Sequence, residues 1–196
     1  MLANAYALPA DIFRAPPHKL PQRFQTLGQV DVSAIRARLA GKTADDWAAN
    51  ALRQQTFSVH RDTQSLVMKW CANSGTDTPV ETTATFAEFE DLLAPILALI
   101  QSHYRYERPV IRKAMFAKLR AGGVISGHVD AAVAIRMVHR IHVPIITHPD
   151  VHFYIGEIDH HFHEGQVFEV DNTRYHSVKN DSPLDRVHLI IDYYHL

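Results

Sequence analysis

The sequence has a single cysteine, no run of basic residues and no apolar segment long enough to cross a membrane. Cys71 has no second cysteine for an internal disulfide, so nothing in the sequence favours an oxidising compartment. The formal net charge is −1 and the lysines and arginines are dispersed, so we expect no nucleic-acid partner. The longest apolar run, Leu92 to Ile100, is about half a membrane span and contains Pro95, so we expect no membrane partner either.

The first 17 residues, MLANAYALPADIFRAPP, lack the basic start and the continuous apolar stretch of a secretory signal. We therefore expect a cytoplasmic protein. With 196 residues, of which 46% are hydrophobic, the chain is long enough for one domain with a substantial core. We interpret it as a single domain, 1–196, in which a mixed helix and strand segment, 1–109, buttresses a catalytic core, 110–196.

The first segment contains one strong helix pattern. Thr85 and Glu88 have the spacing of a capping box, and apolar residues follow at helical spacing up to Ile100. Pro95 lies inside this pattern, where it should kink or split the helix. Upstream, the segments TFSVH and SLVMKW have the composition of two strands separated by a polar turn.

After residue 109 the pattern changes to short strands and turns. VIRKAMFAKL and VISGHVD flank a Gly122-Gly123 turn and predict a hairpin. Five further strand-like segments follow: RIHVPIIT, HFYIG, EIDHHFH, QVFEV and RVHLIIDYY. Seven or eight strands with no helix between them favour a mainly β fold with flanking helices, built on a cupin-like jelly-roll core, the double-stranded β-helix.

Histidine is unusually abundant: there are 14, and 11 of them follow residue 127. Histidine is the commonest metal ligand, so this enrichment favours a metal site, but it also makes accidental motifs more frequent. Residues i and i+2 of a strand share a face, so a His-x-Asp pair can present two ligands together. The chain has three such pairs: His60/Asp62, His128/Asp130 and His148/Asp150.

The surrounding sequence favours one of these pairs. The pair at residue 60 begins a polar stretch, and the pair at residue 148 encloses a proline, so both are typical of turns. His128 and Asp130 instead end an apolar strand just after Gly127, where the missing side chain leaves room for a ligand. A third histidine, His176, follows. Two histidines and one carboxylate can occupy one face of an octahedral Fe(II) and leave positions open for a co-substrate and O₂.

Arg186 lies ten residues after His176, on the apolar strand RVHLIIDYY. An arginine that points into a sheet core is costly unless it meets an anion, and its planar fork matches a carboxylate. The residues alone leave two interpretations open: Arg186 binds the far carboxylate of a keto-acid, or it pairs with Asp185 where the strand begins. A second set, Asp159, His161 and His163, forms either another metal site or a solvated hairpin surface.

Residues 110–194 resemble the aspartyl/asparaginyl β-hydroxylase family of Fe(II)/2-oxoglutarate-dependent dioxygenases, which includes a free-proline 3-hydroxylase. The segments that carry the resemblance are FAKLRAGGVISGHVD, RIHVPIIT, GQVFEVDNTRYHSVKN and RVHLIIDYY. It implies a jelly-roll core, Fe(II) and 2-oxoglutarate. It also implies that His128, Asp130 and His176 bind the iron, and that Arg186 binds the far carboxylate of 2-oxoglutarate.

The resemblance further implies that Arg140 and His142 contact the carboxylate of the co-substrate or of the substrate. A serine that assists 2-oxoglutarate binding in some members aligns with Ala117, and the segments that carry the resemblance all lie after residue 109. The implied reaction hydroxylates an unactivated C–H bond, at the β-carbon of an amino acid or amino-acid residue, while 2-oxoglutarate is decarboxylated to succinate and CO₂. The substrate is then a small molecule or a peptide.

Two other interpretations fit the residues. One is a cupin-like metalloenzyme that shares the metal face but does not use 2-oxoglutarate. The other is a non-catalytic jelly-roll binding protein whose histidines are incidental. The sequence defines neither the substrate and its hydroxylated carbon nor the oligomeric state.

Overall fold

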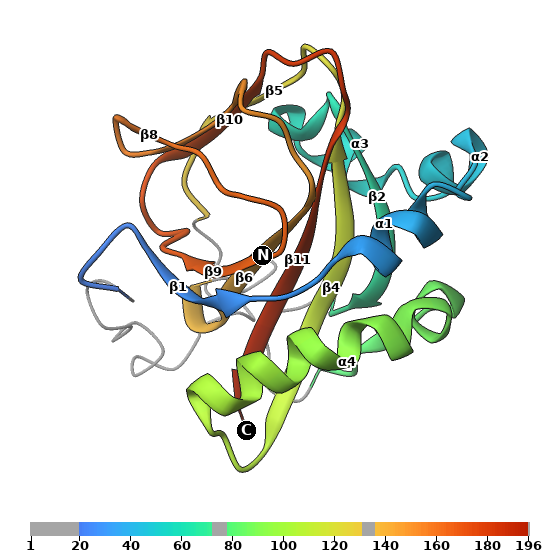
Figure 1. Cartoon of the computed structure of the whole chain (residues 1–196), viewed down its shortest axis with the longest axis vertical. Coiled ribbons are helices and arrows are strands. Elements are labelled where there is room, and N and C mark those ends of the chain that lie inside the picture. The colour runs from blue at the N-terminus through green and yellow to red at the C-terminus, as the bar shows by residue number, and fades with distance from the viewer. Residues whose placement is uncertain (1–19, 72–77, 131–135, 196) are drawn as a thin grey trace, which may run out of the picture.

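The computed structural model describes residues 20–71, 78–130 and 136–195 (Figure 1). Residues 1–17, in which we expect no secretory signal, lie outside the described residues. The helices are α1 (Ser33–Leu39), α2 (Ala44–Ala48), α3 (Leu52–Thr56) and α4 (Ala84–Tyr104). A short 3₁₀ turn, Ser58–His60, follows α3.

The strands form two antiparallel sheets. Within the described residues the larger sheet has seven strands in the order β1-β9-β6-β11-β4-β2-β3, and the smaller has four in the order β5-β10-β7-β8. The larger sheet consists of β1 (Phe24–Gln29), β2 (Thr63–Trp70), β3 (Glu81–Thr82), β4 (Pro109–Leu119), β6 (His139–Ile146), β9 (Gln166–Val170) and β11 (Arg186–His195). The smaller sheet consists of β5 (Val124–His128), β7 (Val151–Ile155), β8 (Ile158–His160) and β10 (His176–Asn180).

The two faces of the larger sheet have different chemistry, as the central strand β11 shows. Successive side chains of a strand point to opposite faces. One set from β11 packs with α4 in the main hydrophobic core: Val187, Leu189, Ile191 and Tyr193. The other set includes three buried polar residues, Arg186, His188 and Asp192, with the partly buried Ile190 between them. Figure 1 shows α4 running across the face of β4 and β11, so the apolar set lies under the helix.

A second, smaller hydrophobic core lies between the two sheets and includes residues of both. Phe153 of β7 and Phe168 of β9 belong to it, together with Phe162, whose ring stacks on Phe168 with centroids 3.7 Å apart. The rings of Phe153 and His188 lie 6.5 Å apart, so the polar face of β11 meets the smaller sheet. The mainly β architecture with flanking helices, predicted from the strand pattern, is confirmed.

Helix α4 continues through Pro95. The helix runs over 21 residues with Pro95 inside it, so it does not split there. Pro95 is exposed, and so is Asp91, whose backbone carbonyl loses its helical partner because proline has no N–H, so water can satisfy it. Among the described residues, no helix is both long enough and apolar enough to cross a membrane.

The predicted capping box of Thr85 and Glu88 is wrong. The helix begins at Ala84 with Thr83 as its N-cap, and no side chain caps it. The Thr83 hydroxyl instead donates to the Val67 carbonyl oxygen of β2 at 2.6 Å, which anchors the start of α4 to the edge of the sheet. A tertiary hydrogen bond therefore replaces the local cap.

Two strand predictions also need correction. TFSVH is not a strand: its residues end α3 and form the 3₁₀ turn. The segments on either side of Gly122-Gly123 are strands, β4 and β5, but they belong to different sheets and do not pair. Gly122 has a φ of 66°, which a glycine adopts without strain, so the chain turns there and crosses from one sheet to the other.

Candidate metal centre and the arginines around it

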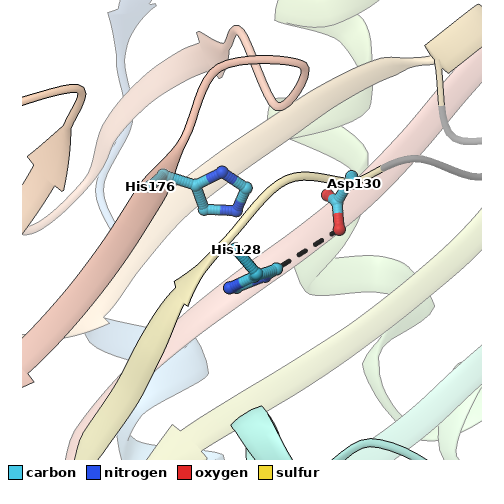
Figure 2. Close-up of side chains that lie close together, drawn as sticks. All are labelled: His128, Asp130 and His176. Atoms are coloured by element: carbon cyan, nitrogen blue, oxygen red, sulfur yellow. Dashed lines mark ion pairs between the residues drawn. The ribbon is translucent and has the colours of Figure 1, made fainter.

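The three predicted ligands come together at the ends of two neighbouring strands of the smaller sheet, β5 and β10. His128 is the last residue of β5 and His176 the first of β10, and the two are direct partners in the antiparallel register. Asp130 follows β5 by two residues. One potential ligand atom from each of the three lies within 4.8 Å of the others. Figure 2 shows the three side chains converging on one point.

Backbone carbonyls orient both imidazole rings. His128 Nδ1 lies 2.8 Å from the Ser126 carbonyl oxygen, and His176 Nδ1 lies 2.8 Å from that of Arg174. A carbonyl oxygen only accepts, so each Nδ1 is the donor, and Nε2 is the nitrogen of each ring that can bind a metal. Burial lowers the pKa of His176, which favours the neutral form that a metal requires. The rings are thus held as ligand-binding tautomers.

The carboxylate of Asp130 is held from one side. Its Oδ2 accepts hydrogen bonds from Arg140 Nη1 and, at 3.3 Å, from Asn172 Nδ2. Its Oδ1 lies 3.9 Å from His128 Nε2, and this contact is the dashed line in Figure 2. Burial alone would raise the pKa of Asp130, but the charge of Arg140, with contributions from the two histidines and the Asn172 hydrogen bond, lowers it to about 2. Asp130 therefore stays ionised, with one oxygen directed at the histidines.

Arg140, on β6, bridges two carboxylates. Its Nε and Nη2 donate to Asp192 of β11, both at 2.8 Å, while Nη1 donates to Asp130. Burial would lower the pKa of Arg140, but the two carboxylates raise it above its ordinary value. Arg140 was predicted to contact a co-substrate or substrate carboxylate. In the structure its fork is occupied by protein carboxylates, and it fastens Asp130 to the larger sheet.

Arg186 has no carboxylate partner among the described residues. It is 2% exposed, its Nε has no hydrogen-bond partner, and its Nη2 donates to His188 Nδ1 at 2.6 Å. The neighbouring Asp185 is turned away: it accepts from the Ala121 backbone at 2.9 Å and lies near Lys118. Burial, with a smaller contribution from the charge of Arg53, lowers the pKa of Arg186 to about 9. The structure thus removes the alternative in which Asp185 neutralises this charge.

His142 lies beside Arg186 on the same interior face. Its Nδ1 is 3.4 Å from His188 Nδ1, and its ring stacks on Phe168 with centroids 5.6 Å apart. Burial, with the charge of Arg186, lowers the pKa of both histidines well below its ordinary value. His188 Nδ1 accepts from Arg186 at 2.6 Å, the shorter of its two contacts. Two neutral histidines therefore surround the arginine without neutralising it.

The other histidine pairs do not form a comparable centre. Among the described residues, only the three predicted ligands form a group of three or more that could hold a metal. Asp159 instead pairs with His152 at 2.6 Å on the surface. Asp62 accepts from Arg120 at 3.0 Å and from the Val124 backbone at 3.1 Å, so it supports the start of β5.

The sequence did not single out two residues that support the centre, Asp192 and Asn172. Asp192 shares the polar face of β11 with Arg186 by strict alternation, so that signal was present in the sequence. Asn172 comes from a loop after β9, and its backbone carbonyl also accepts from the Asp130 amide at 3.2 Å. No local pattern connects it to Asp130.

Gly127 permits a close contact beside the centre. The sequence suggested space for a ligand there, but the end of the Tyr175 ring occupies the place where a Cβ would lie. Tyr175 is 58% exposed and directly precedes His176. The missing side chain thus serves packing between β5 and β10.

We expect Gly127→Ala to weaken metal binding about tenfold, because the displaced Tyr175 would pull on His176, and lost support of a ligand costs about that much. Metal titration with Zn²⁺ measures this effect. The double variant Gly127→Ala/Tyr175→Ala should recover most of the affinity because the clash is gone. Equal weakening in both variants would mean that Tyr175 is not the cause.

The donor set fits Fe(II). Two imidazoles and one carboxylate whose ligand atoms converge match the donor set of non-haem iron oxygenases. Arg186, which has no carboxylate partner among the described residues, is a cation on the interior face of the neighbouring sheet. The three side chains could therefore hold a metal, and Arg186 could bind an anion.

Comparisons with solved structures support the fold. An oxidoreductase of the 2OG-Fe(II) oxygenase family from Burkholderia pseudomallei superposes with a TM-score of 0.55 at 12% identity, covering 85% of this chain and 91% of that one. A non-heme monooxygenase, ThoJ, in complex with nickel superposes with a TM-score of 0.53 at 14% identity, covering 88% of this chain and 74% of that one. No curated protein matches the sequence.

A family comparison gives the identity that the fold alone does not. The family described as aspartyl/asparaginyl beta-hydroxylase matches residues 24–196. The match includes β1 and extends through the three converging ligands to the end of β11, far beyond the segments that suggested the resemblance. Because it covers most of the chain, the protein belongs to the aspartyl/asparaginyl β-hydroxylase family.

Proposed function

We propose that the protein is an Fe(II)- and 2-oxoglutarate-dependent hydroxylase. The observation that supports 2-oxoglutarate as the co-substrate is the burial of Arg186 without a carboxylate partner among the described residues. A buried guanidinium without a counter-ion costs several kcal/mol, so its presence in the core needs an explanation. A dicarboxylic keto-acid supplies one: its keto-acid end has an affinity for the metal, and its far carboxylate has an affinity for the arginine fork.

In this proposal the metal ligands are His128, Asp130 and His176. Iron and 2-oxoglutarate together supply the oxidation of an unactivated C–H bond, with release of succinate and CO₂. The protein supplies the geometry: the Ser126 and Arg174 carbonyls hold the rings, and Arg140 holds the carboxylate.

The surroundings of Arg186 fit the binding of an anion away from water. His142 and His188 stay neutral beside it, and its guanidinium lies over the Phe153 ring at 6.0 Å. A carboxylate bound there would meet one charge in a poorly solvated place, where ion pairing is stronger than at the surface. By the family's chemistry, the proposed target is the β-carbon of an amino acid or amino-acid residue.

The test is the coupling of succinate release to O₂ consumption in the presence of Fe(II). Free amino acids and short peptides are screened by mass spectrometry for a product heavier by one oxygen atom. We expect one substrate to give equal amounts of that product and succinate. Oxidation without 2-oxoglutarate would favour the cupin-like enzyme, and purified protein that binds no Fe(II) would favour the binding protein.

A further inference from the structure

A second unpaired arginine, Arg53, lies beside the metal centre. It comes from α3, in the part of the chain that carried no functional signal in the sequence. Its Nη1 donates to Ser65 Oγ of β2 at 3.2 Å and lies 3.4 Å from Met115 Sδ of β4. Ser65 and Met115 belong to neighbouring strands of the larger sheet. Arg53 thus places its guanidinium against the edge of that sheet's interior face.

His60 connects Arg53 to the metal ligands. Arg53 Nη2 lies 3.1 Å from His60 Nε2, and the His60 ring meets the His128 ring edge to face with centroids 5.6 Å apart. An imidazole carries no negative charge in either of its protonation states, so His60 cannot balance the charge of Arg53. The guanidinium therefore lies one ring away from a ligand of the metal, on the side of α3.

The charge of Arg53 has no carboxylate partner among the described residues, whereas Arg140 has two. Its donors face a hydroxyl, a thioether and an imidazole. Burial lowers the pKa of Arg53 to about 10, which reflects the cost of holding the cation there. A second anion at this site would offset that cost.

The co-substrate does not supply this anion. 2-Oxoglutarate has two carboxylates, one of which belongs to the keto-acid end at the metal and the other of which belongs at Arg186. Both are then used, and Arg53 is left over. The other reactant that can carry a carboxylate is the substrate, whose reacting carbon must approach the metal.

We propose that Arg53 binds a free carboxylate of the substrate, and that the substrate is a small carboxylic acid of the free amino acid class rather than an internal residue of a polypeptide. This inference rests on the proposed function. His60 lies between the guanidinium and His128, so the bound carboxylate sits to one side of the metal ligands. Arg53 is then a specificity-determining residue.

The experiment compares acids with their amides. Protein loaded with Fe(II) and 2-oxoglutarate under anaerobic conditions is titrated calorimetrically with each of the free L-amino acids and with the matching amino-acid amides. We expect at least one acid to bind, and to bind about tenfold or more tightly than its amide, because a charge-assisted hydrogen bond is lost in the amide. The absence of any such preference in the unaltered protein would overturn the proposal.

The variant Arg53→Met removes the charge and keeps much of the side chain's length. It should lower the affinity for the acid about tenfold or more, leave the affinity for the amide unchanged, and so remove the preference. Arg53→Lys should retain part of it. Arg61→Met, on an exposed arginine of the same segment, should behave like the unaltered protein.

The affinity for 2-oxoglutarate separates this inference from the proposed function. If the protein with Fe(II) fails to bind 2-oxoglutarate, the proposed function fails. If 2-oxoglutarate binds normally and Arg53→Met still prefers the acid, only the role of Arg53 fails. A large loss of 2-oxoglutarate affinity in Arg53→Met would also overturn the inference, because it would assign Arg53 to the co-substrate.

Discussion

Replacing His176 with alanine should abolish the visible charge-transfer band that we expect when Fe(II) and 2-oxoglutarate are added to the protein without O₂. The side chain offers one of three converging ligand atoms, and the two that remain, from His128 and Asp130, lie on one connected segment. Loss of a residue that merely supports a ligand weakens metal binding about 10–100-fold, so loss of the ligand itself should exceed about a hundredfold. Absorbance and metal titration measure the two effects.

His148→Ala is the matched control, because it removes the histidine of another His-x-Asp pair that lies away from the centre. Its Nδ1 is 3.5 Å from Asp150 in a surface turn. We expect this variant to keep the band and the metal affinity. Circular dichroism of both variants shows whether the fold persists. An intact band in His176→Ala would show that His176 is not a ligand of the metal.

Replacing Arg186 with leucine should have opposite effects on stability and on co-substrate binding. Without 2-oxoglutarate the variant should be more stable than the unaltered protein, because a buried cation with no counter-ion is replaced by an apolar side chain. With Fe(II) present, its affinity for 2-oxoglutarate should fall about a hundredfold, the equivalent of about 3 kcal/mol. Thermal unfolding with and without 2-oxoglutarate measures both, because a ligand stabilises the state that binds it.

A second ligand makes this test specific. 2-Oxopentanoate has the same keto-acid end and chain length as 2-oxoglutarate but lacks the far carboxylate. The unaltered protein should prefer 2-oxoglutarate strongly, and Arg186→Leu should bind the two about equally. Arg36→Leu, which removes an arginine 50% exposed in a surface ion pair with Glu164, should keep the preference. An unchanged preference in Arg186→Leu would remove the proposed role of Arg186.

The sequence predicted the parts of the centre that depend on strand geometry. His128 and Asp130 are two residues apart at the end of an apolar strand, so their proximity is a local property. His176 was chosen for its position before Arg186, and the structure brings it opposite His128 through the pairing of β5 and β10. The roles of these residues as ligands, and of Arg186 as a carboxylate-binding group, stay predictions that the variants above test.

The features that sequence reasoning missed depend on contacts between distant segments. Arg53 and Asp192 lie more than 100 residues apart and meet the same centre, and no periodic pattern records such a meeting. Whether α4 would split at Pro95 or continue through it could not be predicted, because this depends on which side of the helix faces water. The β4 and β5 segments look like a hairpin locally, but the choice between pairing and crossing to another sheet is made by the packing of all the strands.

The alternation of side chains along β11 divides the strand's tasks by residue number. Odd positions from Val187 to Tyr193 lie in the main apolar core, whereas even positions carry the unpaired arginine, its neutral histidine and the carboxylate that holds Arg140. A substitution at an odd position should act through the amount of folded protein. One at position 186, 188 or 192 should act through the chemistry of each folded molecule. The position of a substitution on this strand thus indicates whether it should lower the amount of folded protein or alter the chemistry of the folded protein.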